Sequence, residues 1–118
     1  IRGRVDDDGL RDAYRRAWVV ASASSSEGWG MTLTEAARCS TPSVATRIPG
    51  HMDAIADGIS GFLVEDRTEL VGRLTEILSN TLLRDRLGAG ARDWSNRFDW
   101  QRTATEAFRV LASTVRDR

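Results

Sequence analysis

Residues 18–46 read WVVASASSSEGWGMTLTEAARCSTPSVAT, and this stretch decides the fold of the 118-residue chain. Residues 18–23 form a short apolar run rich in valine, which is typical of a buried strand. Residues 24–30 are rich in serine and glycine and predict a loop, and residues 31–40 predict a helix. After a proline that ends this helix, residues 43–46 predict a second strand. Strand, helix and strand in this order indicate a parallel pair joined by a right-handed crossover.

The segments on both sides of this unit continue the alternation of helices and strands. The other predicted elements are, in chain order, the end of a strand at 1–5, a helix within 6–18, one or two helical turns at 51–56, a strand at 62–64, and helices at 69–78, 82–98 and 100–113. Helices between short buried strands predict an α/β fold with a parallel sheet. The few strands and the helical C-terminal tail indicate a partial doubly wound, Rossmann-like sheet.

Composition and charge exclude several classes of protein. Seventeen basic and seventeen acidic side chains give a formal net charge of zero, so we expect no nucleic-acid partner. The single cysteine, Cys39, excludes an internal disulfide, and we expect it to be packed in its helix. One free cysteine also fits a reducing, cytoplasmic location. No apolar run approaches the roughly eighteen residues of a membrane span.

Ligands of open parallel sheets bind beyond the carboxyl ends of the strands. The loops after the strands at 18–23 and 43–46 therefore open on one edge of the sheet. We expect Glu27, Gly50 and His51 to converge at this edge, together with Asp53. His51 is the only histidine, and it is either an ordinary loop residue or a contact to the ligand.

The glycine-rich turn at 26–32, SEGWGMT, leads into the N-terminus of a helix. The first amides of a helix lack internal acceptors and carry the positive end of its dipole, so they can bind phosphate. Gly28 and Gly30 allow close approach of the backbone and tolerate positive φ. Glu27 and Glu35 flank this anion site, and carboxylates accept hydrogen bonds from sugar hydroxyls. A nucleotide sugar, with ribose, diphosphate and hexose in a row, has the matching layout.

A simpler interpretation of these residues stays open at this point. Two glutamates around a Gly-x-Gly turn also occur by chance, and Glu27 and Glu35 would then be solvated. Arg38 and Arg47 are expected to be solvated as well, with contact to a phosphate as the alternative.

Four aromatic side chains gather near the C-terminal helices: Trp94, Phe98, Trp100 and Phe108. Packing in the core is the favoured interpretation of this group. An interface with a domain outside the chain is the alternative.

The segment at 24–64 resembles the retaining glycosyltransferases of GT-B fold, specifically the large family 4, or group 1, type. Glu27 and Glu35 match the pair of glutamates that this family separates by seven residues. EAARCSTPSVAT matches the family segment that follows the second glutamate, DGISGFLV matches a later glycine motif, and RFDW stands where a Phe-Ser-Trp motif introduces the terminal helix. The resemblance covers about residues 3–111.

The resemblance implies a role for each matching residue. Glu27 matches the glutamate beside the donor sugar and is the candidate catalytic residue. Glu35 matches the glutamate that binds the ribose hydroxyls. The implied donor-binding residues are Gly28, Trp29, Gly30, Met31, Thr32 and Glu35, and the candidate contacts near the base or in loops are Arg4, Val5, His51 and Asp53.

The reaction that the resemblance implies is transfer of a hexosyl group from a nucleotide-diphosphate sugar to an acceptor hydroxyl, with retained anomeric configuration. It implies neither a cofactor nor a metal ion, because amides and basic side chains neutralise the leaving diphosphate. We expect the acceptor, a sugar, a lipid or a small molecule, to bind an N-terminal domain that lies outside this chain. Residues 1–118 would then be part of the C-terminal nucleotide-sugar-binding domain, inactive when isolated. Peripheral membrane association of the full-length protein is compatible with this expectation.

The sequence departs from the family pattern at three positions. Trp29 replaces the usual phenylalanine of the turn, Ser40 stands where glycine is common, and Asp53 stands where many members carry glutamate. The alternative from another class is a non-catalytic nucleotide-sugar-binding module. Within enzymes, the alternatives are a GT-B epimerase, against which the EGWG motif speaks, and a phosphorylase.

Overall fold

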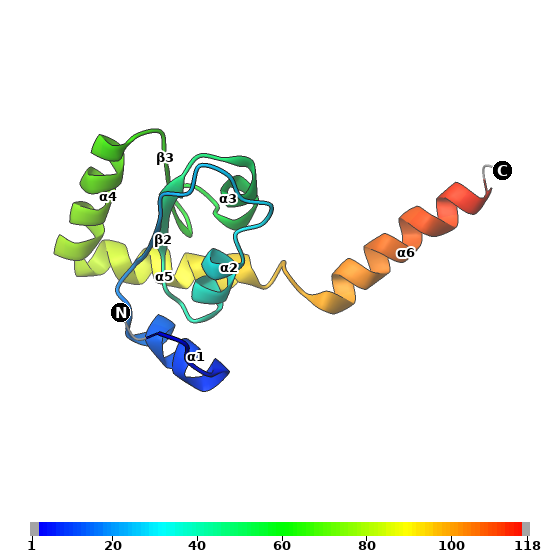
Figure 1. Cartoon of the computed structure of the whole chain (residues 1–118), viewed down its shortest axis with the longest axis horizontal. Helices are drawn as coiled ribbons and strands as arrows, with labels where there is room; N and C mark the ends of the chain where they lie inside the picture. The colour runs from blue at the N-terminus through cyan, green and yellow to red at the C-terminus, as the bar shows by residue number, and fades with distance from the viewer. Residues whose placement is uncertain (1–2, 117–118) are drawn as a thin grey trace.

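A computed structural model describes residues 3–116 of the chain. These residues form three strands and six helices, which alternate as far as the third strand and end in three consecutive helices (Figure 1). In chain order they are α1 (Asp7–Arg16), β1 (Val20–Ser22), α2 (Met31–Arg38), β2 (Ser43–Thr46), α3 (Pro49–Ala54), β3 (Gly61–Val64), α4 (Arg67–Ser79), α5 (Thr81–Ser95) and α6 (Trp100–Arg116). Every element that the sequence predicts beyond residue 5 is therefore present.

The three strands form one parallel sheet in the order β1-β2-β3. Val20 pairs with Ser43 on the next strand, and Val44 pairs with Phe62 on the third. Because all three strands run in the same direction, their carboxyl ends lie at one edge. This topology confirms the predicted parallel α/β fold and brings the loops after β1 and β2 to the same side.

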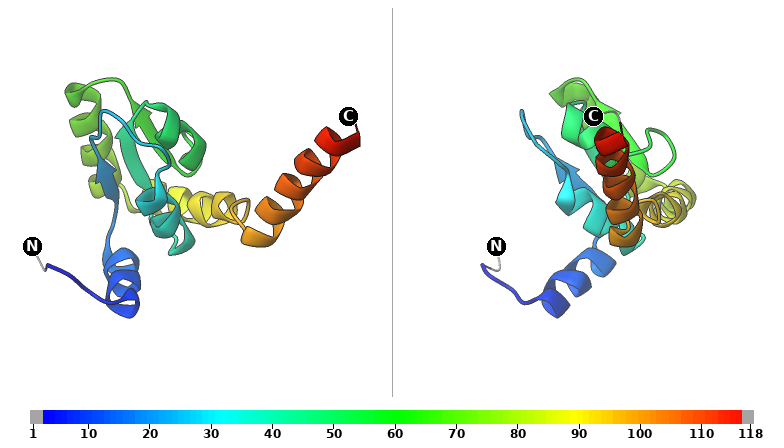
Figure 2. Two further views of the ribbon diagram at one scale, coloured as in Figure 1. Left: turned by 45° about the vertical axis from the view of Figure 1, so that its right-hand side comes forward. Right: turned by 90° about the vertical axis from the view of Figure 1, so that its right-hand side faces the viewer.

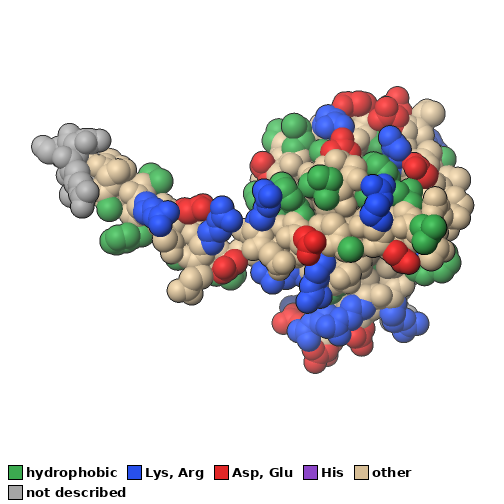
Figure 3. Space-filling model, turned by 180° about the vertical axis from the view of Figure 1, so that it is seen from behind, with side chains coloured by type: hydrophobic (Ala, Val, Ile, Leu, Met, Phe, Trp, Pro, Cys, Tyr) green, Lys and Arg blue, Asp and Glu red, His purple; other side chains and the backbone are tan. Residues whose placement is uncertain are grey.

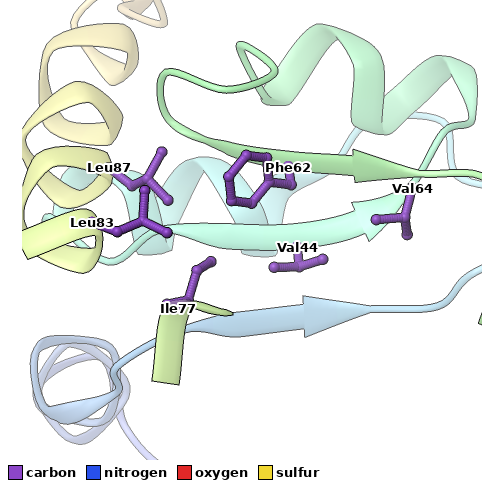
Figure 4. Close-up of a cluster of buried hydrophobic side chains, with 6 residues drawn as sticks. All are labelled: Val44, Phe62, Val64, Ile77, Leu83 and Leu87. Carbon is purple, nitrogen blue, oxygen red and sulfur yellow. The ribbon is translucent and has the colours of Figure 1, made fainter. Parts of the chain in front are cut away.

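Alternate residues of the strands divide the core into two layers. Val44, Phe62 and Val64 pack with side chains of α4 and α5 (Figure 4), including Ile77. On the other face of the sheet, a second cluster joins the strands to α2 and α3; its buried members are Leu33, Ala45, Ala54, Ile55 and Leu63. Each fully buried aliphatic side chain of this kind contributes about 1.5–3 kcal/mol. Helices thus cover both faces of the sheet.

Short polar residues set the ends of several helices. Asp6, Asp66 and Asn80 accept hydrogen bonds from the first-turn amides of α1, α4 and α5 at 2.8–3.0 Å. At the other end of α2, Ser40 adopts φ 61°, a left-handed conformation that cannot continue a helix. The helix predicted at 31–40 therefore ends at Arg38.

The helix α6 extends away from the rest of the molecule, as Figure 1 and the left view of Figure 2 show. Trp100 on this helix is 88% exposed and Phe108 is 71% exposed, so the favoured prediction of core packing is wrong for both. Trp94 and Phe98 are partly buried and contact each other edge to face, with ring centroids 6.3 Å apart. Seen from behind (Figure 3), hydrophobic side chains lie open along this projecting helix between arginine and acidic side chains, and the same three kinds of side chain are mixed over the body.

Two smaller predictions differ from the structure. Residues 3–5 form no strand, because no neighbouring strand pairs with them and Gly3 has φ 66°. The prediction for residues 1 and 2 lies outside the described residues. Met31, expected to be available for burial, is 63% exposed at the start of α2. Among residues 3–116, no helix is both long enough and apolar enough to span a membrane.

Candidate functional site

The loops after β1 and β2 meet at the carboxyl edge of the sheet. Gly50, in the first turn of α3, lies against the backbone of Glu27: a Cβ at this position would stand 2.6 Å from the Glu27 carbonyl oxygen. The same Gly50 accepts a hydrogen bond from the amide of Gly30 at 3.3 Å. Only a glycine permits this approach, and through Gly50 the helix α3 contacts both Glu27 and Gly30 of the glycine-rich turn. Glu27, Gly50 and His51 converge as the topology predicts, whereas Asp53, expected with them, is an exposed residue of α3.

Gly28 and Gly30 serve this turn without positive φ, because neither is among the residues with a left-handed backbone. Gly30 is buried, and a Cβ there would stand 3.0 Å from Leu33 and 3.1 Å from Ala54. At Gly28, in contrast, an added Cβ would meet no atom within 4 Å. Gly30 is therefore closely packed against Leu33 and Ala54, and Gly28 faces open space in which a ligand can approach the backbone.

The turn presents a defined set of free amides. The amide of Met31 donates to the carbonyl of Trp29 at 2.9 Å, and that of Gly30 is bonded to α3 as described. Within the described part of the chain, the N–H groups of Gly28, Trp29 and Thr32 have no acceptor. Three of the five amides named from the sequence are thus available to an anion at the positive end of α2.

The carboxylate of Glu27 is held by a hydroxyl of its own loop. Ser24 donates its O–H to Glu27 Oε1 at 2.9 Å. The carbonyl of Ser24 in turn accepts the hydroxyl of Thr46 at 2.5 Å, which ties this loop to the end of β2. Glu27 is exposed, so its second carboxylate oxygen remains open to a ligand.

His51 is a buried structural anchor, only 1% exposed. Its Nδ1 lies 2.8 Å from the carbonyl oxygen of Thr46, and its Nε2 lies 3.2 Å from the hydroxyl of Ser22. Since a carbonyl only accepts, Nδ1 carries a hydrogen and donates it to Thr46, and Nε2 lies within hydrogen-bond distance of Ser22. His51 therefore joins the ends of β1 and β2 to α3, and it is neither of the two roles predicted from its place in a loop.

Glu35 lies on the exposed face of α2 and is contacted from α1. The phenol of Tyr14 donates to Glu35 Oε2 at 3.1 Å. Burial raises the pKa of Tyr14 to about 12, with the hydrogen bond to Glu35 and its negative charge acting in the same direction and Thr32 acting against them. The phenol consequently stays a donor at neutral pH.

The two arginines near the site have partners elsewhere. Arg47 pairs with Asp57 at 2.7 Å and with Glu65 at 2.6 Å. Burial alone would raise the pKa of Asp57, but the amide of Leu63 and the guanidinium of Arg47 hold it below its usual value. Arg38 donates to the carbonyl of Phe98 at 2.9 Å. Both arginines are exposed, as the favoured interpretation expects, and each in addition contacts a group of the fold.

The remaining predicted site residues lie at the surface. Trp29 is 42% exposed, and its ring contacts Phe98 edge to face at 5.2 Å between centroids. Arg4, Val5 and Asp53 are exposed side chains. The Trp29 contact joins the turn to the segment between α5 and α6, so the aromatic group near the C-terminus is partly a support for the site.

The sequence does not indicate Tyr14 and Ser24 as supports of the site. It places Gly50 at this edge of the sheet, but it does not indicate the backbone contact of Gly50 with Glu27. Tyr14 offered a signal, because a tyrosine on the apolar face of a helix needs a partner for its hydroxyl. The roles of Ser24 and Gly50 depend on how two loops meet in space, which spacing along the chain does not give.

The sequence model of the family described as glycosyl transferases group 1 matches residues 1–94. The chain therefore belongs to the group 1 glycosyltransferases. A curated relative, D-inositol 3-phosphate glycosyltransferase of Stackebrandtia nassauensis, is 34% identical over 111 residues, which are 92% of this chain and 25% of that protein. The chain thus spans about a quarter of the length of this relative.

Solved structures share the fold. Sucrose-phosphate synthase from Thermosynechococcus elongatus superposes with a TM-score of 0.85 at 24% identity, over 98% of this chain and 30% of that one. The structure of Anabaena Alr3699/HepE in complex with UDP-glucose gives a TM-score of 0.77 at 25% identity, over 88% of this chain and 30% of the other. The architecture is that of the C-terminal domain of GT-B glycosyltransferases, as the resemblance implied.

Proposed function

We propose that this chain is the donor-binding part of a longer transferase, which moves a hexosyl group from a nucleotide-diphosphate sugar to an acceptor hydroxyl with retained anomeric configuration. The observation that carries the proposal is the turn at residues 28–32. It presents three free amides at the N-terminus of α2. These amides lie between the carboxylate of Glu35, which accepts a hydrogen bond from α1, and the carboxylate of Glu27, which accepts one from its own loop. Diphosphate, ribose and hexose each have a partner of suitable chemistry in this arrangement.

The diphosphate lies at the free amides in this proposal, where the dipole of α2 adds positive potential. Glu35 accepts hydroxyls of the ribose, and Glu27 accepts hydroxyls of the hexose. As the bond to the diphosphate breaks, negative charge grows on the leaving group, and the amides stabilise that charge without reorganisation. The same carboxylate of Glu27 favours positive charge that develops at the anomeric carbon. We propose that these groups act without a metal ion or a cofactor.

The rest of the enzyme lies outside the 118 residues in this proposal. The acceptor, a sugar, a lipid or a small molecule, would bind an N-terminal domain. Trp100, Phe108 and Leu111 of α6 are each more than 60% exposed, and packing against that other part of the protein would cover them. The isolated chain is then expected to bind donor weakly at best and to transfer nothing.

The test uses the full-length protein with a panel of nucleoside-diphosphate hexoses, beginning with UDP-glucose because a structural neighbour was solved with it. Release of the nucleoside diphosphate reports transfer. The NMR coupling constant of the product's anomeric proton reports its anomeric configuration. We expect release and a product with the anomeric configuration of the donor. Binding of a donor without release of its nucleoside diphosphate, when sugar, lipid and small-molecule acceptors are supplied, would make the protein a nucleotide-sugar-binding module. A product with inverted anomeric configuration would overturn retention.

A further inference from the structure

Tyr14 contacts the site from a separate helix, outside the glycine-rich turn and α2. It lies on α1, and its phenol donates to Glu35 Oε2 across 21 positions of sequence at 3.1 Å. One carboxylate oxygen of Glu35 is thereby occupied. The other, Oε1, is left to accept hydrogen bonds from a ligand.

The backbone of Tyr14 is itself fixed to the end of α2. The hydroxyl of Thr41, a buried side chain, donates to the Tyr14 carbonyl at 2.7 Å. The tyrosine is partly buried between the two helices, so its ring has little freedom. The phenol oxygen therefore contacts Glu35 from a tyrosine whose backbone and ring are held in place.

A glutamate on an exposed helix face otherwise samples several rotamers. Ordering such a side chain at the moment of binding costs conformational entropy, and a contact that orders it beforehand removes this cost. The phenol is well suited to this task, because it remains protonated through the neutral pH range while the carboxylate accepts its hydrogen bond.

We propose that Tyr14 is a positioning residue, which holds Glu35 in the orientation that takes the ribose hydroxyls of the nucleotide. The inference rests on the proposed function, because it assumes that Glu35 binds ribose. It adds that α1 is part of the nucleotide site and that the hydroxyl of one tyrosine sets nucleotide affinity without touching the nucleotide.

The test is a double-mutant cycle of Tyr14→Phe and Glu35→Ala in the full-length protein, with titration calorimetry of UDP. Tyr14→Phe removes one oxygen and keeps the ring, so the packing of α1 on α2 survives. We expect Tyr14→Phe to weaken UDP binding roughly threefold to tenfold. In the Glu35→Ala background the same change should have no further effect. The kcat at saturating donor should stay near that of the wild type.

Two controls separate positioning from a general structural effect. Inorganic pyrophosphate lacks ribose, so its inhibition constant should not change in Tyr14→Phe. Thr75→Val removes a hydroxyl of α4 that donates to the Val71 carbonyl at 2.8 Å, and it should leave UDP affinity unchanged. Equal loss of UDP and pyrophosphate affinity would show that Tyr14 acts on the fold and would overturn the inference.

The possible results distinguish the inference from the function on which it rests. If Glu35→Ala weakens UDP binding but Tyr14→Phe does not, or if the two losses add, the positioning role is overturned and the proposed function stands. If Glu35→Ala leaves UDP affinity unchanged, the proposed ribose contact is overturned, and the role of Tyr14 falls with it.

Discussion

Gly50 and Glu27 are in direct backbone contact, although 23 positions of sequence separate them: a Cβ on Gly50 would stand 2.6 Å from the Glu27 carbonyl oxygen. The contact brings the first turn of α3 against the residue that opens the glycine-rich turn. Because the neighbouring atoms belong to backbone, they cannot rotate away as a side chain would. The position of Glu27 is therefore set by a residue of the helix α3.

Substitution Gly50→Ala should displace the loop at Glu27 and destabilise the fold. Overpacking of this kind costs about 1–3 kcal/mol. Urea denaturation measures the stability, and turnover of the full-length protein should fall with it. Gly72→Ala is the matched control, since a Cβ on this residue of α4 meets no atom within 4 Å. Alanine there should stabilise by about 0.5–1 kcal/mol. Equal stability of both variants would contradict a close backbone contact between Gly50 and Glu27.

His51→Ala should be strongly destabilising. It removes a fully buried ring together with its hydrogen bonds to the Thr46 carbonyl and the Ser22 hydroxyl, which keep only the Ile48 amide and the Ser24 hydroxyl as partners. Loss of packing and of hydrogen bonds together should cost roughly 2–5 kcal/mol in the free energy of unfolding. The control is Met52→Ala on the same helix, 50% exposed, with an expected effect of about 0.5 kcal/mol or less. A similar small loss in both variants would mean that His51 is no anchor.

The sequence predicts most of the fold because hydrophobic periodicity and turn residues carry it. Valine-rich runs predict the strands, and the run at 31–40 predicts α2 to within two residues of its end. The predicted helix is two residues too long because Ser40 takes a left-handed conformation, which helix propensity alone does not reveal. The exposed face of α6 was mistaken for core, since an apolar helix face predicts burial without saying what covers it.

In the candidate site, the sequence predicts the residues expected to contact a ligand but not the residues that support them. The residues expected to touch a ligand, such as Glu27 and Glu35, follow from motif spacing, and the parallel topology brings their loops together. Their supports follow from tertiary contacts. Ser24, Tyr14 and Gly50 reach the site through hydrogen bonds or van der Waals distance that no short-range pattern encodes.

Asp57→Asn should remove a stabilising term that depends on pH. The pKa of Asp57 is lower in the folded chain than in the unfolded one, so its contribution is present above about pH 4 and is lost as the pH falls through the folded pKa. Asparagine can still accept from the Leu63 amide but cannot pair with Arg47. Side-chain exposures of 34% and 40% limit the pair to roughly 0.2–1 kcal/mol. The stability difference between wild type and variant, measured in urea, should shrink from pH 7 to pH 3; a difference that is constant with pH would argue against the ion pair.

Glu35→Ala should weaken binding of the nucleoside diphosphate whether or not a hexose is attached. Hydrogen bonds to a charged acceptor are worth roughly 1.5–3 kcal/mol, so the dissociation constant should rise by at least tenfold. Titration calorimetry with UDP and with UDP-glucose measures both affinities on the full-length protein. Unchanged affinity for UDP would exclude Glu35 from the ribose site.

Glu27→Gln separates an enzyme from a binding module. Glutamine keeps the shape of the side chain and still accepts the Ser24 hydroxyl, which lies 2.9 Å from Oε1 in the wild type, so the substitution removes charge alone. In our proposal this charge acts at the anomeric carbon and strengthens its interaction in the transition state. We therefore expect kcat of the full-length protein to fall by about two to three orders of magnitude, as when a preorganised electrostatic contact is lost.

Affinity for the free nucleoside diphosphate should barely change in Glu27→Gln, because that ligand carries no hexose. Steady-state kinetics on the natural donor and calorimetry on the free diphosphate together make the test. Glu76→Gln is the matched control, since this glutamate of α4 pairs with Arg73 at 2.9 Å and belongs to no proposed contact with the donor. Its kcat should equal that of the wild type. If kcat also survives Glu27→Gln, the carboxylate is only a loop residue that Ser24 happens to hold, and the proposed role of its charge in transfer is wrong.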